Sequence, residues 1–315
     1  MQPDVLAWAR KTLTQSNYRI DGDFYPIREV PWSSVYAINT DDKVIYLKQS
    51  IHQFDNEAPL LDYLTQQLCH HLPKLIAYNP TNKAFLMQDA GLPLRNIFKT
   101  QTYDLHLAEQ ALQNYTEIQQ ACILKTEQLI AHGVPDWRLK ELPSLYLKLL
   151  KNEDLLLADG LAYSDIDALH RLHFRVIDYC NKLGAYPVPE TLEHGDFHDN
   201  NILLKDHSII INDWGDAVIT HPFFSISSFI SSAKRNHNLS SEECNRLEES
   251  YLIEWQPFAT KEQLKIIMQL IHLLNPIKFS LNFSRISQCI GINHLGEYHG
   301  YIQDALKTFI ITNEH

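Results

Sequence analysis

The sequence is short of cysteine and contains no C-x-x-C pair. Its 315 residues include only five cysteines, an odd number, and these lie far apart. A disulfide framework or a zinc ribbon needs cysteines at closer and paired spacing, so neither is indicated. We expect reduced and mostly buried thiols at Cys69, Cys122, Cys180, Cys244 and Cys289.

Positive charge is scarce as well. The 27 lysines and arginines are outnumbered by 38 aspartates and glutamates, which gives a formal net charge of -11, and no long basic run is present. Binding to a nucleic-acid backbone depends on clustered cations that displace counterions. The composition therefore argues against a nucleic-acid partner.

Long apolar runs are also missing. No uninterrupted apolar run approaches the roughly 18 residues of a membrane-spanning helix. The N-terminal segment MQPDVLAWARKTL reaches the charged pair Arg10-Lys11 without an apolar core of the signal-peptide kind. We expect a soluble cytoplasmic protein with no membrane partner, and the sequence leaves its oligomeric state open.

What the chain does have is apolar material for a large core. Hydrophobic residues make up 45% of it, which at this length is enough for a core divided between two lobes. The first part predicts a helix over about residues 3–16, and a second helix over about 55–68 with Leu60, Leu64 and Leu68 on one side. Short strands are expected at 35–39, 43–48, 74–79 and 83–88, the first two joined by a turn at Thr40-Asp41-Asp42.

From about residue 103 the apolar spacing is mostly helical. The expected helical segments are 104–133, 164–184, 241–255 and 261–277. One exception is a hairpin of two short strands, 201–204 and 208–213, embedded among the helices. The composition changes near Gly91 and Pro93, so we predict an N-terminal lobe of residues 1–90 and a C-terminal lobe of residues 91–315.

The segment LEHGDFHDNNILL, residues 192–204, concentrates polar groups just before this hairpin. Asp196 and Asn201 flank a loop, and Asp213 stands at the end of the following strand. This set suits phosphoryl transfer, in which one carboxylate accepts the proton of an attacking hydroxyl while an asparagine and a second carboxylate hold Mg²⁺. Magnesium prefers hard oxygen ligands, which these two side chains supply.

HGDFHDNNILL followed by INDWGDA resembles the catalytic and metal loops of the aminoglycoside phosphotransferase family, relatives of choline kinases. Its pattern is H-G-D-x-x-x-x-N followed by I-D-W-G or a close variant. Gly195 stands where protein kinases have the arginine of H-R-D, and no A-P-E segment follows, which favours the small-molecule branch. The resemblance implies an α+β, protein-kinase-like, two-lobed fold with a small antiparallel sheet-plus-helix N-lobe and a larger, mostly helical C-lobe. It assigns catalysis to Asp196 and metal binding to Asn201 and Asp213.

The resemblance also implies residues that bind the nucleotide. Lys48 matches the lysine that contacts the α- and β-phosphates, and Glu57 in the following helix is placed to pair with it. The segment FLMQDAG resembles the link between the lobes, where adenine bonds the backbone at Gln88 and Ala90 behind Met87. ATP and Mg²⁺ are therefore the expected cofactors.

Two segments depart from the family pattern. The phosphate-covering turn of relatives is rich in glycine and serine, whereas REVPWSSVYAI offers only Ser33 and Ser34. After the metal loop many relatives have D-P-x-x-D-L, and here HPFFSIS places His221 and Ser225 in the two acidic positions. We expect Ser225 to cap the next helix, a common role of serine. The segment after about residue 230 carries no motif that matches the family.

Other interpretations of the polar segment concern its remaining side chains. The HGDFH cluster also fits an H-x-D-x-H metal site of a hydrolase. In the kinase-like interpretation His194 supports the loop through its backbone, His198 does the same or faces the acceptor, and Asp199 is a solvated loop residue.

The predicted function is an ATP-dependent phosphotransferase that moves the γ-phosphoryl group to a hydroxyl of a small molecule. The acceptor would be a metabolite or an aminoglycoside-like antibiotic. Two alternatives stay open. One is a catalytically weak nucleotide-binding module, suggested by the missing glycines and by Ser225. The other is a metal-dependent hydrolase that uses the HGDFH cluster.

Overall fold

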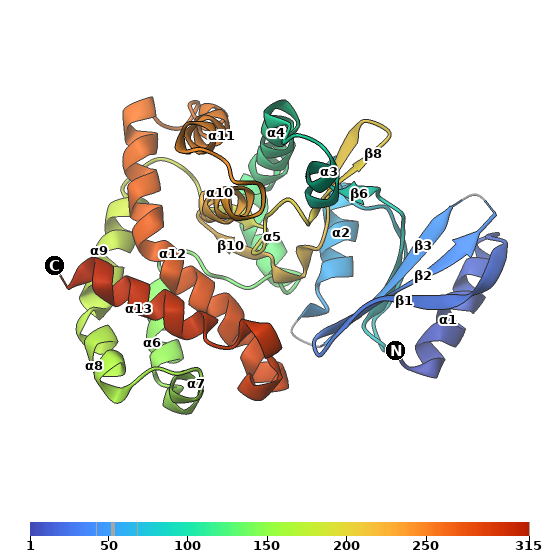
Figure 1. Cartoon of the computed structure of the whole chain (residues 1–315), viewed down its shortest axis with the longest axis horizontal. Coiled ribbons are helices and arrows are strands. Elements are labelled where there is room, and N and C mark those ends of the chain that lie inside the picture. Colours follow the sequence, from blue (N-terminus) through green and yellow to red (C-terminus); the bar gives the residue numbers. More distant parts are fainter. Residues whose placement is uncertain (42, 52–53, 68, 315) are drawn as a thin grey trace.

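An antiparallel sheet forms most of the N-terminal part of the chain (Figure 1). The computed structural model describes residues 1–41, 43–51, 54–67 and 69–314, and within these the sheet has five strands in the order β1-β2-β3-β5-β4. The strands are β1 (Ile20–Val30), β2 (Ser33–Thr40), β3 (Val44–Ser50), β4 (Leu75–Asn79) and β5 (Ala84–Gln88). All four predicted strands are confirmed. Asp42 of the predicted turn and Leu68 of the predicted helix lie outside the described residues.

Strand β1 was not predicted from the sequence. It lies at the edge of the sheet, pairs only with β2 among the described strands, and has mostly exposed side chains. Its ladder with β2 shifts register on both sides of Tyr25 and Pro26. An edge strand tolerates proline and needs no alternating apolar face, so its sequence lacks the pattern by which strands are recognised.

Two helices lie on opposite sides of this sheet. Apolar residues of α1 at a spacing of four, Val5, Ala9 and Leu13, share a buried cluster with Leu47 of β3. Because successive side chains of a strand point to opposite faces, Lys48 faces away from α1 and toward α2. The bounds are Pro3–Gln15 for α1 and Glu57–Gln66 for α2, which confirms both predicted helices.

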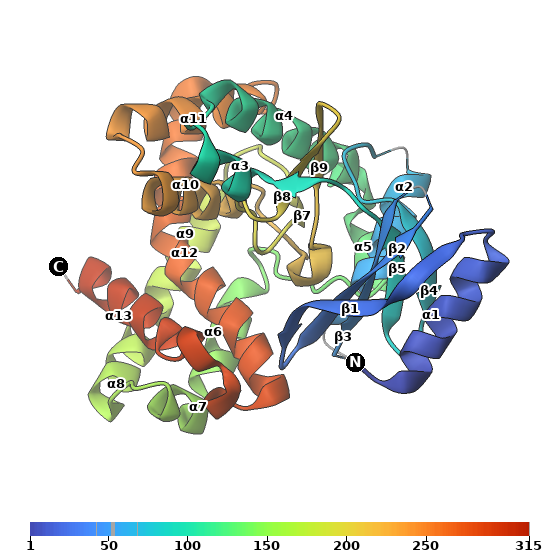
Figure 2. The same ribbon diagram turned by 45° about the vertical axis from the view of Figure 1, so that its right-hand side comes forward.

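The C-terminal part is mostly helical and forms the larger lobe (Figures 1 and 2). Its α-helices are α3 (Leu94–Thr100), α4 (Leu105–Cys122), α5 (Thr126–Ala131), α6 (Leu142–Leu150), α7 (Glu153–Ala158), α8 (Tyr163–Arg171), α9 (His173–Gly184), α10 (Phe224–His237), α11 (Ser241–Ile253), α12 (Lys261–Ile290) and α13 (Tyr301–Asn313). Short 3₁₀ helices are η2 (Ile123–Lys125), η3 (Trp214–Asp216), η4 (Ile292–His294) and η5 (Gly296–Tyr298). None of the helices in the described part of the chain is long and apolar enough to cross a membrane.

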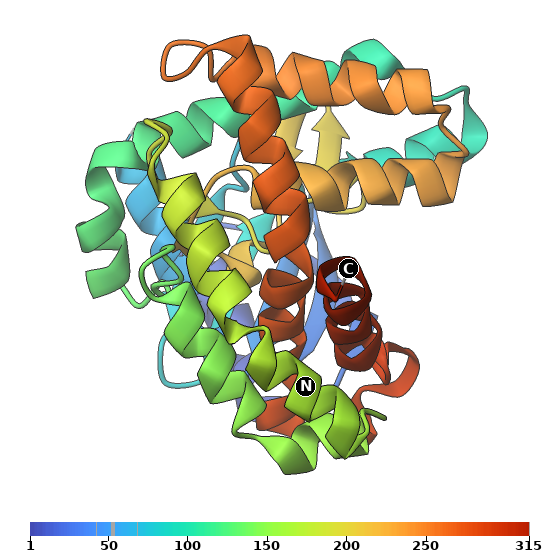
Figure 3. The same ribbon diagram turned by 90° about the vertical axis from the view of Figure 1, so that its left-hand side faces the viewer.

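Helix α12 is longer than the sequence pattern indicated. It contacts α6, α9, α10 and α13, and it runs through the helical lobe between α9 and α13 (Figure 3). The predicted segment ends at residue 277, whereas the helix continues past Pro276 to Ile290. Its second half has buried Lys278, Ser280 and Ser284 among apolar residues, which hides the apolar period.

A three-stranded sheet joins the lobes. The predicted hairpin is β8 (Ile202–Lys205) and β9 (Ser208–Ile211), and β6 (Leu92–Pro93) pairs with β8. Lys205 Nζ donates to the carbonyl and to the carboxylate of Asp89, both at 2.8 Å. Gly91 has φ of +105°, and a Cβ there would lie 2.2 Å from the Leu204 carbonyl oxygen. The link between the lobes is thus fixed against the hairpin. The division at residue 90 stays a prediction.

Candidate active site

The loop between β7 (Thr191–Glu193) and β8 carries Asp196. Its side chain is half exposed, 50%, and Oδ2 accepts a hydrogen bond from Asn201 Nδ2 at 3.1 Å. His198 Nε2 lies 3.3 Å from the same oxygen. Burial raises the pKa of the Asp196 carboxyl, but the hydrogen bond and charge of His198 outweigh it and hold the pKa well below its usual value. Asp196 is therefore an ionised carboxylate in a fixed orientation.

His194 fastens this loop to the end of β9. Its Nε2 lies 2.9 Å from the Asn212 carbonyl, and its Nδ1 accepts the Asp196 amide at 3.3 Å. Burial lowers the pKa of His194, which favours the neutral ring that can donate from one nitrogen and accept at the other. The predicted supporting role of His194 is confirmed.

The same contacts weigh against the hydrolase alternative. Both ring nitrogens of His194 are used by the backbone, so neither is left to bind a metal ion. His198 Nδ1 accepts the Asn200 amide. Within the described ranges, no group of three or more histidine, cysteine, aspartate or glutamate side chains is placed to hold a metal ion.

The backbone conformation between His194 and Asp196 requires a glycine. Gly195 has φ of +86°, and a Cβ there would lie 2.1 Å from the Asp216 carbonyl oxygen. A side chain at this position would collide with backbone that cannot move aside. The backbone at the end of η3 therefore occupies the space in which the side chain of an arginine would begin in an H-R-D sequence.

Asn201 and Asp213 lie at the same end of the β8–β9 hairpin. Ile202 pairs with Ile211, so Asn201, just before Ile202, lies opposite Asn212, just after Ile211, and the Asn212 amide donates to the Asn201 carbonyl at 2.8 Å. The Asn201 amide nitrogen donates to Asp196, which leaves its Oδ1 without a donor among the described residues. Asp213 has left-handed φ and ψ of 66° and 62°, and its side chain is 32% exposed. An amide oxygen and a carboxylate fit the ligand chemistry of Mg²⁺.

Lys48 joins the N-terminal lobe to the metal loop. Its Nζ lies 2.6 Å from Glu57 Oε2 and 2.5 Å from Asp213 Oδ1. Burial lowers the pKa of Lys48, but the carboxylates of Asp213 and Glu57 outweigh it and the pKa is raised. Burial raises the pKa of Glu57, against the effect of Lys48. The structure brings Lys48, Glu57 and Asp213 together, as the resemblance implied, and their roles stay predictions.

The segment proposed to bind adenine lies at the end of β5. The Gln88 amide donates to the Lys74 carbonyl at 2.9 Å, and the Gln88 side chain reaches Tyr18. Within the described residues the Ala90 amide donates to no protein acceptor. The Ala90 amide is therefore available to a ligand, whereas the Gln88 amide is not.

The turn that was predicted to cover the phosphates is a tight hairpin whose tip packs against another segment. Ser33 and Ser34 begin β2 and pair with β1, so only Pro31 and Trp32 form the turn. The Trp32 ring packs edge-on against Tyr298 of η5, with ring centroids 5.7 Å apart. The tip of the turn therefore contacts the C-terminal segment. The roles of both serines stay predictions.

The prediction that Asp199 is solvated was wrong. Its side chain is 1% exposed and accepts hydrogen bonds from Arg95 at 3.1 and 2.8 Å, from Ser232 at 2.8 Å and from His237 at 2.6 Å. These donors come from α3 and α10, far from Asp199 in the sequence. A buried carboxylate is tolerated because it is fully paired. Asp199 therefore ties the loop between β7 and β8 to α3 and α10.

The prediction that Ser225 caps a helix was also wrong. Helix α10 begins at Phe224, and the Ser225 hydroxyl donates to Glu193 Oε1 at 2.5 Å. Tyr115 lies between this serine and the loop: its hydroxyl is 2.6 Å from Ser225 Oγ and accepts the His194 amide at 3.0 Å. Glu193 is fully buried, and the Ser225 hydroxyl satisfies one of its carboxylate oxygens. Ser225 therefore supports the loop that carries Asp196, through Glu193 and Tyr115. At the other acidic position, burial lowers the pKa of His221 to about 3, so it is neutral.

Two further residues at this site come from α12, in the segment without a matching motif. Lys278 Nζ donates to the Gly195 carbonyl at 3.0 Å and lies 2.9 Å from Glu193 Oε2. Asn282 Nδ2 donates to the same carbonyl at 2.8 Å. The sequence analysis missed both, and the sole signal was two polar residues within an apolar helical run.

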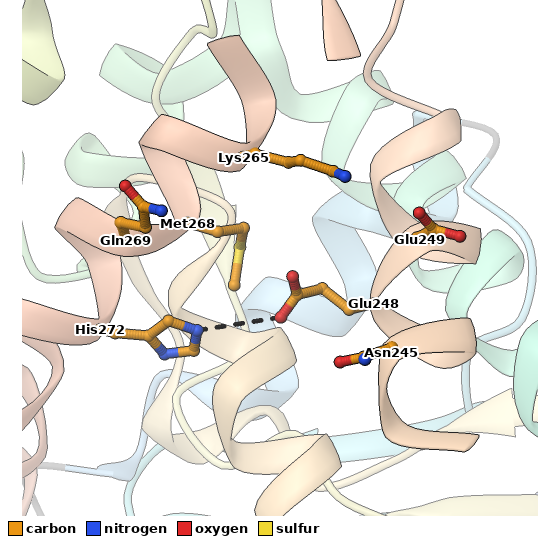
Figure 4. A pocket seen from close by; sticks show the side chains of 7 residues that line it. All are labelled: Asn245, Glu248, Glu249, Lys265, Met268, Gln269 and His272. Carbon is orange, nitrogen blue, oxygen red and sulfur yellow. Dashed lines mark ion pairs between the residues drawn. The ribbon is translucent and has the colours of Figure 1, made fainter. Parts of the chain in front are cut away.

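A separate groove lies between α11 and α12 (Figure 4). Across it, His272 Nε2 lies 3.8 Å from Glu248 Oε2. None of the residues assigned to phosphoryl transfer lines it, so it is not the site of that chemistry. The lining residues are Asn245, Glu248, Glu249, Lys265, Met268, Gln269 and His272.

Several solved structures share this fold. A choline/ethanolamine kinase family protein from Mesorhizobium loti superposes with a TM-score of 0.62 at 15% identity, over 98% of this chain and 96% of that one. Choline kinase from Cryptosporidium parvum Iowa II gives 0.63 at 10% identity, over 98% and 94%. The GDP complex of wild-type aminoglycoside 2′-phosphotransferase-IIIa gives 0.59 at 15% identity, over 99% and 100%. These superpositions of the whole chain confirm the protein-kinase-like fold that was expected from the sequence.

The sequence itself gives the family. No curated protein sequence matches the chain significantly. The sequence profile of the phosphotransferase enzyme family matches residues 27–266, which include Lys48, Asp196, Asn201 and Asp213. The match covers most of the chain and both lobes. The chain belongs to the phosphotransferase enzyme family.

Proposed function

We propose that this protein transfers the γ-phosphoryl group of ATP to a hydroxyl group of a small molecule. The observation that carries the proposal is an unbroken line of contacts across the two lobes. The Asn201 side chain donates a hydrogen bond to Asp196, and the Asn201 carbonyl accepts the amide of the residue before Asp213. Asp213 and Glu57 each form an ion pair with Lys48. A base, metal ligands and a phosphate-binding cation are thus held in one site.

The catalytic role of Asp196 follows from its charge and orientation. An ionised carboxylate can accept the acceptor's hydroxyl proton and aim its oxygen at the γ-phosphorus. Phosphoryl transfer passes through a loose transition state, so holding the hydroxyl in line matters more than the strength of the base. As the new O–P bond forms, the bond to the β-phosphate oxygen breaks, ADP leaves and Asp196 receives the proton.

The remaining residues act on the phosphates. Asn201 Oδ1 and the Asp213 carboxylate would hold Mg²⁺, which supplies charge neutralisation at the β- and γ-phosphates. Lys48 would bind phosphate oxygens in place of part of its contact with Asp213, while Glu57 would keep the ammonium in place. The Ala90 amide donates to no protein acceptor among the described residues and would donate to the adenine ring.

Thermal unfolding with different ligands tests this proposal against the two alternatives. A phosphotransferase and a nucleotide-binding module should both be stabilised by MgATP and less by ATP with a chelator, whereas a metal hydrolase should respond to Zn²⁺ alone. ADP release with a panel of amino alcohols and aminoglycosides then separates the first two. Stabilisation by MgATP without release stimulated by any acceptor would favour the binding module.

Ala90→Pro is expected to weaken ATP binding by about tenfold or more, because it removes a single amide donor. Calorimetric titration with MgATP measures the change. Gln88→Ala is the matched control, since its side chain contacts Tyr18 and the adenine would meet backbone only. Equal affinity in Ala90→Pro and wild type would place adenine elsewhere.

Asp213→Asn is expected to reduce nucleotide binding mainly when Mg²⁺ is present. The substitution keeps the shape of the side chain but removes the charge that binds the cation and pairs with Lys48. Titration of ATP with and without Mg²⁺ shows whether the magnesium-dependent gain in affinity is lost. A gain of the wild-type size would remove Asp213 from the metal site.

A further inference from the structure

We propose that Lys278 of α12 is a positioning residue that holds the catalytic loop so that Asp196 faces the acceptor hydroxyl. The inference rests on the proposed function of Asp196. It assigns a part of the active site to the segment that carries no family motif. Lys278 itself does not touch the reacting atoms, and it acts through the backbone of Gly195 and through Glu193.

The contact is made at the peptide group that carries Asp196. The Gly195 carbonyl belongs to the planar peptide unit that ends at the Asp196 Cα. Lys278 and Asn282 both donate to this carbonyl, at 3.0 and 2.8 Å. On the opposite edge of the same unit, the Asp196 amide donates to His194 Nδ1. The peptide plane is thus held from both sides, and with it the direction in which the Asp196 side chain leaves the backbone.

Burial makes this contact costly to break. Lys278 is 3% exposed and Glu193 is fully buried, so each charge has lost its water and depends on the other. Ser225 binds the second oxygen of Glu193. The acidic group expected at position 225 is absent, and the carboxylate that braces the loop comes instead from Glu193, with its counter-charge from α12.

The geometry of α12 explains how one helix supplies both donors. Lys278 and Asn282 are four residues apart and lie on one face of the helix, one turn above the other. Ser280 lies on the same helix, is equally buried, and donates within the helix to the Pro276 carbonyl. It therefore offers a control that changes a buried polar group of α12 without touching the loop.

The test uses the full chain and two independent variants. Lys278→Met combined with Glu193→Gln removes the ammonium without leaving a buried carboxylate unpaired. Asn282→Leu keeps that ion pair and removes the second donor to Gly195. Three quantities are measured for each variant and for Ser280→Ala. They are the hydrogen exchange of peptides covering residues 192–201, the calorimetric affinity for MgATP, and ADP release with the acceptor that stimulates it most.

We expect faster exchange across residues 192–201 in both variants, and a fall of about 10- to 100-fold in kcat for the double variant, the size expected when a catalytic group is misplaced by about 1 Å. MgATP affinity should stay within about twofold of wild type, since the nucleotide contacts come from other residues. Ser280→Ala should match wild type in exchange and in kcat.

Two outcomes would overturn the inference. The first is wild-type kcat and wild-type exchange in both variants. The second is a loss of MgATP affinity as large as the loss of kcat, which would show a general structural role. If the wild type itself releases no ADP, the proposed function fails separately. The exchange data then decide alone: faster exchange confined to residues 192–201 supports the role of Lys278, and unchanged exchange rejects it.

Discussion

Asp196→Asn is expected to reduce phosphoryl transfer by about 10²- to 10⁴-fold, the range typical of a lost general base, while MgATP affinity stays near that of the wild type. The replacement keeps the shape of the side chain and an oxygen that can accept from Asn201. It removes the negative charge that orients the hydroxyl and takes its proton. Steady-state ADP release and calorimetric titration with MgATP measure the two quantities.

A matched control for this change is available on the same hairpin. Asp206 is an exposed residue in the turn between β8 and β9, and Asp206→Asn makes the same chemical change away from the site. It should leave turnover and affinity unchanged. Full turnover in Asp196→Asn, or loss of nucleotide binding as complete as in Asp213→Asn, would reject the role assigned to Asp196.

Lys48→Met is expected to lower both stability and turnover, by separable amounts. Removal of one partner from a buried ion pair costs about 3–5 kcal/mol, and we expect the lower end because Asp213 keeps contact with solvent. Turnover should fall by about 10²-fold or more, because the cation that neutralises phosphate charge is lost. Chemical denaturation and ADP release give the two values.

The double variant Lys48→Met with Glu57→Gln separates these effects. Burial raises the pKa of Glu57, so its charge is the one that becomes costly when Lys48 is removed. Replacing it with glutamine should restore most of the stability and none of the turnover. Lys11→Met, at an exposed position of α1, controls for loss of a lysine in the same lobe. Recovery of turnover together with stability would make Lys48 a purely structural residue.

The parts of the site that the sequence predicted are formed by short stretches of chain. Asp196, Asn201 and Asp213 lie in one segment whose loop, hairpin and second loop follow each other directly. Lys48 ends the alternating pattern of β3, and Glu57 begins the next helix, so their meeting follows from one strand, one connection and one helix turn. His194 could be assigned to the loop because its partners, Asn212 and the Asp196 amide, lie in the same segment.

Two of the errors concern polar residues whose hydrogen-bond partners lie far away in the sequence. Asp199 was predicted to be solvated because it lies in a loop, and its donors come from positions 95, 232 and 237. Ser225 looked like a helix cap because a serine before an apolar run usually is one, and its actual acceptor is Glu193. Strand β1 was missed because an edge strand with exposed side chains carries no apolar pattern.

The amino-acid sequence alone is enough to identify the family, the two-part fold and the H-G-D-x-x-x-x-N motif, because each depends on local spacing and residue type. How the loop that carries Asp196 is held depends on the tertiary structure. Lys278 and Asn282 are 83 and 87 residues from Gly195, and a lysine in a helix is ordinarily a solvated charge. Burial and pairing depend on which surfaces meet when the chain folds, and no local pattern records that.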